Sequence, residues 1–381
     1  MKYSLLIAND FPPVTSGIAT VFDQIWRRLP AGRTRILAPR CPGSEAFDRR
    51  YPVPVHRLRL PLGEGPRAKL GKTLLSTLWI LLRAVGDAPG HLHCGQVFSS
   101  GIAGWLCKRV FNIPYTVWVY GSETIRLAST GPGVRLMETI LDESQWVITN
   151  SNATSEEYRA FGVPGPKIRR VYPGVDPDTF CPVPPDRGWI ERLQLSGKKV
   201  LLTVARLDQR KGHDMVLRAL KRLQNTHDVV YLIGGKGREE PRLRSLADEL
   251  GLRGRVHFLG FVPNADLPVL YNLCDAFVMP NRVTRGTALA GDIEGFGITF
   301  VEAGACEKPV VAGRSGGALE AVLDGETGLV VDPHSPEEIA GAINRLFSNP
   351  EYASRLGRQA RQRIEREFDW RILARLVEEI L

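Results

Sequence analysis

The sequence predicts an α/β protein made of two doubly wound domains, each built on a parallel sheet. Short apolar runs alternate with stretches of helical periodicity along the whole chain, which is typical of parallel strands covered by helices on both faces. A proline-rich segment at 176–186 interrupts this alternation near the middle. The length of 381 residues allows two hydrophobic cores, and the content of 43% hydrophobic and 24% charged residues excludes a disordered or fibrous chain.

The first half opens with a strand and a helix. Tyr3 to Ala8 is an apolar run that ends in a polar pair and two prolines, as expected of a buried strand followed by a loop. The segment 18–29 then carries apolar residues at the spacing of one helical face. Further strands are expected at 91–94, 115–119 and 146–149, with helices around 99–109 and 134–143.

The second half repeats the pattern after a linker that its prolines make stiff. Strands are expected at 200–204, 229–233, 256–259, 276–279, 310–312 and 328–331. Helical patterns include 215–223 and 243–250, and three helices close the chain at 336–347, 351–367 and 370–380. We therefore predict a first domain at 1–180 and a second at 188–367. Ligands of such sheets bind beyond the carboxyl ends of the strands, so two facing sheets predict a site in the cleft between the domains.

Composition narrows the class of protein further. No apolar run approaches the ~20 residues of a membrane-spanning helix, and the apolar stretch at the N-terminus is too short for a signal peptide. The six cysteines form no C-x-x-C pair, which favours a reducing cytoplasm over a zinc or redox motif. His91 and His93 would face the same way on a strand, as metal ligands or as core residues. The net charge of +9 lies mostly in residues 1–187 and indicates either an anionic partner or simple solubility.

The first candidate binding loop is 9–17, which leaves the first strand and opens a helix at Gly17. The free N–H groups and the positive end of that helix suit a phosphate. The loop is not a G-x-G-x-x-G motif, so dinucleotide binding is disfavoured. A glycine beside a helix start can also be no more than a turn.

The second candidate loop carries Arg206 and Lys211. It directly follows the strand at 200–204, so Arg206 is expected at the carboxyl end of a strand and Lys211 just before a helix. An arginine offers planar bidentate contacts and a lysine a point charge, so together they can bind a diphosphate. A solvated basic loop is the alternative.

The third candidate segment runs from Glu294 to Glu302. Its Gly295, Phe296 and Gly297 lead into a helix expected to start near Ile298, whose free N–H groups would face an anion. Glu294 precedes this helix and Glu302 lies in its first turns, so the two carboxylates can reach opposite ends of one ligand. Neither carboxylate suits a metal site, because no other carboxylate or histidine clusters here. The alternative is that two glutamates eight positions apart are a coincidence.

This third segment resembles the Glu-x7-Glu motif of family 4 retaining glycosyltransferases with the GT-B fold. Arg206 and Lys211 match the diphosphate-binding pair of that family, and the segments 150–154, 172–176, 256–261, 314–317 and 324–329 match further parts of it. The segment 279–282 is similar to the bacterial subgroup that includes the phosphatidylinositol mannosyltransferases. The resemblance implies two Rossmann-like domains facing a cleft, with an acceptor-binding domain first, a donor-binding domain second, and a C-terminal helix at 368–381 that packs back on the first domain.

Two positions depart from the family pattern. Ser16 stands before Gly17 where paired glycines are usual, and a serine still permits a tight turn. Tyr120 stands where the family commonly has a histidine that contacts the donor sugar. A phenol does not act as an acid or base near neutral pH without a large shift in its pKa, so we expect Tyr120 to orient the sugar or the acceptor.

The resemblance implies transfer of a hexose, with retention and without a metal or other cofactor, from a UDP- or GDP-sugar to the hydroxyl of a glycan, a glycolipid or a small molecule. Cations at the leaving diphosphate stabilise the charge that develops there, a role for Arg206, Lys211 and the amides of 295–298. By the same resemblance, Glu294 holds sugar hydroxyls and Glu302 the ribose. Phe261 and Val262 meet the base, and Gly17 approaches the diphosphate.

A non-catalytic scaffold on a membrane or on nucleic acid is the main alternative, and a sugar-nucleotide epimerase or a phosphorylase is another. The segment 67–83 is a basic amphipathic pattern, which suits either an anionic membrane surface or an ordinary helix facing the core. No nucleic-acid-binding motif occurs, so no nucleic-acid partner is expected. We expect a cytoplasmic enzyme that can sit peripherally on the inner face of the membrane.

Overall fold

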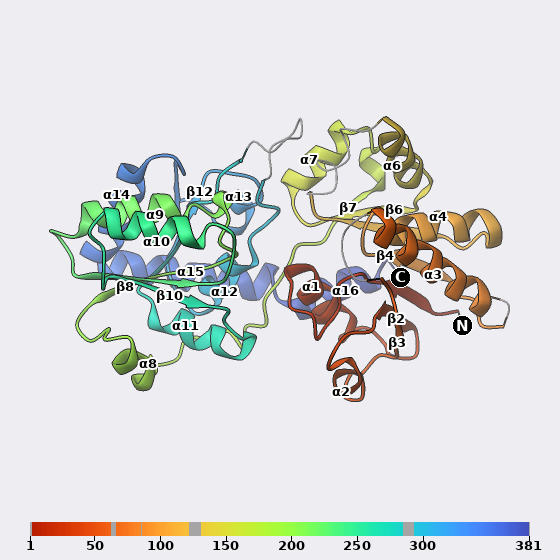
Figure 1. The fold of residues 1–381 in the computed structure, drawn as a ribbon, viewed down its shortest axis with the longest axis horizontal. Helices are drawn as coiled ribbons and strands as arrows, with labels where there is room; N and C mark the ends of the chain where they lie inside the picture. Colours follow the sequence, from red (N-terminus) through yellow and green to blue (C-terminus); the bar gives the residue numbers. More distant parts are fainter. Residues whose placement is uncertain (1, 62–65, 85, 122–130, 285–292, 381) are drawn as a thin grey trace. The chain divides into compact units, whose positions relative to one another are not determined.

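The structure is a computed structural model of the full chain, and it describes residues 2–61, 66–84, 86–121, 131–284 and 293–380. The chain divides into two compact units (Figure 1). Unit 1 comprises Met1–Pro173 and Trp370–Leu381, and unit 2 comprises Gly174–Asp369. Residues 174–180 therefore belong to unit 2, whereas the sequence analysis placed them in the first domain. The reason is local, because Arg361 donates hydrogen bonds to the carbonyls of Pro177 and Phe180 at 3.3 Å each.

Unit 1 contains a parallel sheet of seven strands in the order β3-β2-β1-β4-β5-β6-β7. The strands are β1 (Ser4–Ile7), β2 (Thr34–Pro39), β3 (Val55–Leu58), β4 (His91–Cys94), β5 (Tyr115–Val119), β6 (Trp146–Thr149) and β7 (Ile168–Arg170). The strand order reverses between β1 and β4, which are paired neighbours. Loops after these two strands therefore flank the crevice where ligands of such sheets bind.

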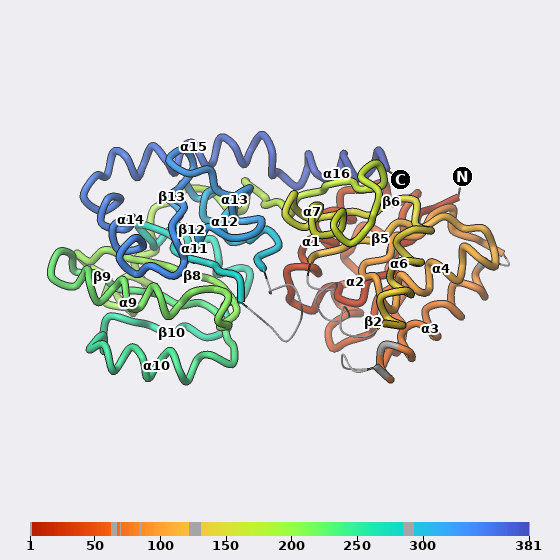
Figure 2. The backbone as a smooth tube through the Cα atoms, turned by 90° about the horizontal axis from the view of Figure 1, so that it is seen from above, coloured from red at the N-terminus to blue at the C-terminus, as the bar shows by residue number. Residues whose placement is uncertain are grey.

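Helices cover both faces of this sheet (Figure 1). They are α1 (Gly17–Trp26), α2 (Ser44–Asp48), α3 (Pro66–Ala84), α4 (Ser100–Phe111), α6 (Gly131–Glu143), α7 (Asn152–Ala160) and α16 (Trp370–Glu378). Side chains of α3, α4 and α6 share one core with the strands. On α1, Phe22 and Trp26 pack edge to face on Trp118 of β5. The C-terminal α16 packs on α1, and in Figure 2 the blue end of the chain accordingly lies with the red N-terminal unit.

Unit 2 contains a parallel sheet of six strands in the order β10-β9-β8-β11-β12-β13. The strands are β8 (Lys199–Val204), β9 (Val229–Gly234), β10 (Val256–Gly260), β11 (Ala276–Met279), β12 (Val310–Gly313) and β13 (Gly328–Val331). These six agree with the predicted strands within one residue at each end. The strand order reverses between β8 and β11, so this unit has its own switch point.

The helices of unit 2 form a layer on each face of its sheet. They are α8 (Arg187–Arg192), α9 (His213–Leu223), α10 (Glu240–Glu249), α11 (Leu267–Leu273), α12 (Ile298–Ala305), α13 (Ala318–Ala321), α14 (Pro336–Ser348) and α15 (Pro350–Glu367). α9, α10 and α14 share one core with the strands. On the other face, Phe277 of β11 contacts Tyr271 of α11 and Phe300 of α12.

Three strands, all in unit 1, were not predicted from the sequence. β2 has only the three apolar residues 36–38 between the half-buried Arg35 and Pro39. β3 is half-buried along its length, and β7 is a three-residue edge strand. None of them has the continuous apolar run that marks a fully buried parallel strand. The predicted α/β class with two parallel sheets is confirmed.

Helix α3 departs in part from the usual distribution of polar and apolar residues. Thr73, Ser76 and Thr77 are buried, as is the apolar Ile80, whereas five of the helix's leucines are exposed. The exposed leucines are Leu70, Leu74, Leu75, Leu78 and Leu82, with exposed fractions between 41% and 70%. Within the part of the chain that the structure describes, no helix is both long and apolar enough to span a membrane.

Candidate active site

The loops at the switch point of unit 2 bring together the residues predicted to bind a diphosphate. Arg206 and Lys211 follow β8, and Glu294 precedes α12 in the connection from β11. Lys211 and Glu294 form a direct ion pair, and both side chains are nearly buried, with 12% and 9% of their surface exposed. The structure therefore joins two predicted residues that lie 83 positions apart in the sequence.

Glu294 has a second cation beside it. The guanidinium of Arg210 lies 3.8 Å from the Glu294 carboxylate and donates a hydrogen bond of 2.6 Å to the carbonyl of Ile293. Burial alone would raise the pKa of Glu294, but the charges of Lys211 and Arg210 outweigh it and lower that pKa below the ordinary value. Glu294 is thus an anion at neutral pH, which can accept hydrogen bonds from hydroxyl groups but holds no proton to give.

The segment 295–298 forms the start of α12. Gly297 adopts a left-handed φ of 88°, and a Cβ atom there would collide with the ring of Phe300, so only glycine fits this turn. The side chain of Phe296 is buried and packs against Phe368 at a ring distance of 5.4 Å. Phe296, like Gly295 and Gly297, can therefore contact a ligand only through its backbone. Ile298 is half-buried at the first position of the helix.

Glu302 lies on the same helix in a different environment. Tyr271 of α11 donates a hydrogen bond of 2.7 Å to its carboxylate. Burial raises the pKa of Glu302 to about 7, and the Tyr271 hydrogen bond offsets this only in part. The two carboxylates of the motif thus differ chemically, because Glu294 has cationic neighbours and Glu302 has a phenol.

The remaining predicted residues of unit 2 are more exposed. The Arg206 side chain is 70% exposed, and its Nε lies 3.3 Å from a carboxylate oxygen of Asp208. Its charge still contributes to lowering the pKa of Glu294. Phe261 and Val262 follow β10, and Phe261 exposes 57% of its surface. An exposed aromatic ring at a strand end is available for stacking on a planar base.

Ser16, Gly17 and Tyr120 belong to unit 1. Ser16 caps α1, because its hydroxyl accepts a hydrogen bond of 3.0 Å from the amide of Ala19. Gly17 is the exposed first residue of that helix. Tyr120 follows β5 and packs edge to face on Phe22 at 6.1 Å, so its ring is anchored to α1.

Three polar residues at the switch point of unit 1 were given no role in the prediction, although the first of them, Asn9, begins the predicted loop 9–17. Asn9, after β1, donates hydrogen bonds to Gln96 at 2.6 Å and to Ser99 at 2.5 Å, both of which follow β4. Ser99 has a φ of 70°, a backbone conformation that residues other than glycine rarely adopt. A strained residue beside a switch point is the kind of signal that marks functional loops, but neither feature is visible in the sequence pattern.

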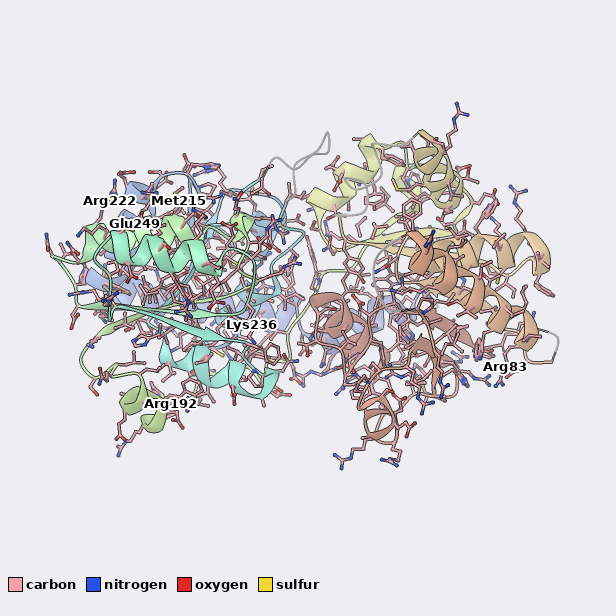
Figure 3. All side chains as sticks on the ribbon, in the orientation of Figure 1. Arg83, Arg192, Met215, Arg222, Lys236 and Glu249 are labelled. Carbon is pink, nitrogen blue, oxygen red and sulfur yellow. The ribbon has the colours of Figure 1, made fainter. Side chains whose placement is uncertain are left out.

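Arg210 and Lys236 were missed in unit 2. Arg210 was part of the predicted basic loop without a role of its own. Lys236, labelled in Figure 3, follows β9 in a glycine-rich turn. The carbonyl of Lys236 accepts a hydrogen bond of 3.1 Å from the amide of Leu207, which places this turn against the Arg206 loop.

The paired histidines of β4 are core residues. His91 shares a hydrogen bond of 2.9 Å with Thr116, and the indole of Trp118 lies 3.4 Å from Nδ1 of His93. Burial lowers the pKa of both rings, that of His91 to about 4. Both imidazoles are therefore neutral at physiological pH.

Comparison with known proteins identifies the family. The model described as "Glycosyltransferase Family 4" matches residues 15–179, and the model "Glycosyl transferases group 1" matches residues 188–363. A GDP-mannose-dependent alpha-(1-6)-phosphatidylinositol monomannoside mannosyltransferase of Mycolicibacterium smegmatis is 32% identical over 99% of this chain and 97% of its own length. A D-inositol 3-phosphate glycosyltransferase of Thermobifida fusca is 29% identical over 78% of this chain and 72% of its own.

Solved structures agree with the fold. Anabaena HepE in complex with UDP and glucose superimposes with a TM-score of 0.82 at 20% identity, covering 100% of this chain and 99% of that one. Sucrose-phosphate synthase of Thermosynechococcus elongatus gives 0.77 at 22% identity, covering 100% and 98%. The fold is therefore GT-B. The Mycolicibacterium and Thermobifida relatives are named as enzymes and not as non-catalytic scaffolds. The chain belongs to the family 4 glycosyltransferases, and it is a glycosyltransferase.

Proposed function

We propose that the protein transfers a mannosyl group from GDP-mannose to a hydroxyl of an inositol- or mannose-containing glycolipid, with retention of configuration and without a metal. The ion pair between Lys211 and Glu294, with Arg210 beside it, is the observation that carries the proposal. The donor and the acceptor are suggested by the mycobacterial relatives, whose names specify both.

The cationic loop supports the leaving-group chemistry. When the bond between the sugar and the diphosphate breaks, negative charge grows on the diphosphate. Lys211 is already held in place by Glu294, so it can stabilise that charge with little reorganisation, and Arg206 offers an exposed guanidinium on the same loop. The N-terminus of α12 adds backbone donors. These groups supply the stabilisation that a metal ion provides in other enzymes.

The two carboxylates support separate roles. Glu294, ionised and adjacent to Lys211, suits the hydroxyls of the transferred sugar, which it would orient relative to the diphosphate. Glu302, with Tyr271 as its donor, suits the ribose hydroxyls. On the acceptor side, the amide and hydroxyl groups of Asn9, Gln96 and Ser99 offer the donors and acceptors that a polyol needs.

The exposed leucines of α3 support a peripheral position on an anionic membrane. Leu70, Leu74, Leu78 and Leu82 recur every four residues, which places them along one side of the helix. The helix contains no acidic residue, and Arg67 and Arg83 are exposed on it, the latter labelled at its C-terminal end in Figure 3. A second copy of the chain would bring like charges together here, whereas anionic lipid would pair with them. A lipid acceptor would then be met at the surface where it resides.

The test is a direct assay with purified protein. GDP-mannose, UDP-glucose and UDP-galactose are each offered with a phosphatidylinositol mannoside in mixed micelles, with and without EDTA. We expect transfer from GDP-mannose only, an α-anomeric product by NMR, and unchanged turnover in EDTA. A β-linked product contradicts retention, loss of activity that Mg²⁺ or Mn²⁺ restores contradicts the metal-free mechanism, and preference for a UDP-sugar contradicts the donor.

A further inference from the structure

We infer that Arg282 is a positioning residue for the reaction: its buried ion pair with Asp214 holds the loop after β11 against the loop after β8 and so fixes Lys211 and Arg210 relative to Glu294. The inference rests on the proposed function of that site. It assigns a role to two residues that do not themselves contact Glu294.

The pair is built for rigidity. The Arg282 guanidinium donates hydrogen bonds of 3.0 Å to both carboxylate oxygens of Asp214. Only 9% and 10% of the two side chains are exposed. Both bonds come from the same nitrogen, Nη2, and a charge-assisted pair buried in this way is strong. Asp214, in the first turn of α9, thereby restrains the end of the Arg282 side chain.

The backbone of Arg282 carries this geometry to the site. Its amide donates a hydrogen bond of 2.8 Å to the carbonyl of Arg210. Arg210 in turn bonds the carbonyl of Ile293, and Lys211 bonds Glu294. The chain of contacts thus runs from Asp214 through Arg282 to the two cations and ends at the carboxylate that they flank.

One close backbone approach and three hydrogen bonds complete the arrangement. Gly212 has a φ of 73°, and a Cβ atom there would collide with the carbonyl of Pro280, so the two loops touch through their backbones. Asn281 is fully buried: it donates to the carbonyl of Ser315 at 3.0 Å and accepts from the amide of Gly313 at 3.2 Å. A third loop, which connects β12 to α13, follows Gly313 and contains Ser315 and Gly317. The amide of Gly317 donates a hydrogen bond of 2.9 Å to the carbonyl of Glu294. Residues 280–282 therefore lie between both loops that hold the ion pair.

A displacement of about 1 Å in a catalytic group can cost ~10²-fold in rate. We therefore expect Arg282→Met to lower kcat/KM for the donor ~10- to 100-fold and to weaken GDP binding in calorimetry, at a temperature where circular dichroism shows the protein folded. Arg282→Lys, which keeps the charge but not the length and planar shape of the guanidinium, should recover part of the loss. Asp214→Asn, which keeps the volume, gives the same test from the other partner if Arg282→Met does not fold.

A double-mutant cycle separates positioning from stability. If Arg282 acts through Lys211, the effect of Arg282→Met shrinks to less than ~3-fold in a Lys211→Ala background. Arg363→Met is the matched control, because this largely buried arginine bonds the carbonyls of Glu320 and Ala321 on α13. It should lower Tm and leave kcat and KM unchanged.

An equal loss in both backgrounds overturns the inference, as does a loss of activity in Arg363→Met of the same size at the same loss of Tm. A Lys211→Ala enzyme with wild-type turnover and GDP affinity overturns the diphosphate site itself. That outcome is distinct from a failure of the Arg282 variants alone, which leaves the proposed function standing.

Discussion

At the scale of single residues, Glu302 combines a raised pKa with a hydrogen-bonding partner, and this makes its proposed role measurable. Its pKa of about 7, against an ordinary 4.5, means that the folded protein binds an extra proton between these pH values. The corresponding stability is fully present below pH 4.5 and is lost as pH rises through 7. A carboxylate that accepts hydrogen bonds from ribose must first lose this proton.

We therefore expect KM for the donor to fall as pH rises from about 6 to 8 in the wild type. Glu302→Gln should show a raised KM that no longer changes over this range, with kcat little affected, because the contact is equal in ground and transition states. Tyr271→Phe removes a hydrogen bond that lowers the pKa of Glu302 and should move the transition to higher pH. Steady-state kinetics with GDP-mannose across pH measures all three.

Glu294 provides the contrast. Its carboxylate lies beside Lys211. In the proposed reaction, charge changes at this position, so Glu294→Gln should lower kcat with a smaller effect on nucleotide affinity. A profile in which Glu294→Gln loses GDP affinity while Glu302→Gln keeps it would reverse the two roles.

At the scale of elements, the exposed leucines of α3 make the proposed membrane contact testable. Fully burying one leucine is worth roughly 1.5–3 kcal/mol, so even partial insertion of several leucines into lipid is substantial. The threonines and serine that α3 buries instead contribute little hydrophobic stabilisation to the core. Ile80 is fully buried, and Trp79 and Leu81 pack against the core, so these residues hold the helix in a register that leaves a row of leucines exposed.

The double variant Leu74→Ser, Leu78→Ser should bind anionic vesicles at least ~10-fold more weakly than the wild type, with no loss of Tm, because both leucines are exposed. Leu376→Ser, an exposed leucine on α16 of the same unit, is the control and should bind normally. Salt should weaken the wild-type interaction, since exposed charges are screened. Co-sedimentation with phosphatidylglycerol and phosphatidylcholine vesicles measures this binding. Equal binding by the double variant and the wild type would contradict a membrane contact through α3.

At the scale of the whole molecule, two buried histidines predict a loss of stability in acid. Burial lowers the pKa of His91 to about 4 in unit 1 and of His213 to about 4 in unit 2. The unfolded chain binds protons at these rings from about pH 6.5 downward, whereas the folded chain does so only near pH 4, so stability falls as pH falls through this window. A shift from 6.5 to about 4 corresponds to about 3 kcal/mol for each ring.

Thermal unfolding between pH 4 and 7 should therefore show Tm decreasing with acidity. In His91→Gln this decrease should be smaller, and the change should affect the transition that belongs to unit 1, because two compact units need not unfold together. His334→Gln, which changes an exposed histidine, should leave the slope as in the wild type. An unchanged slope in His91→Gln would show that His91 is already accessible to protons in the folded protein.

The sequence by itself determined the class of fold, the six strands of the second sheet and the family. Strands of parallel sheets are buried on both faces, so 229–233 and 276–279 stand out as apolar runs whatever surrounds them. The residues of the Glu-x7-Glu motif and of the Arg206 loop were likewise visible, since each is a local pattern. Edge strands such as β3 were not, because a half-buried strand lacks a continuous apolar run.

Only the tertiary structure decided which of these patterns meet. The contact of Lys211 with Glu294 depends on the pairing of β8 with β11, and nothing local to either loop specifies it. The same holds for Arg282 with Asp214 and for Asn9 with Gln96 and Ser99. For α3, the sequence left open whether the apolar residues face the core or a membrane surface. The fold buries Ile80 together with Thr73, Ser76 and Thr77 and leaves five leucines exposed. Periodicity reports that a helix has an apolar side, and the neighbouring elements determine whether that side is covered.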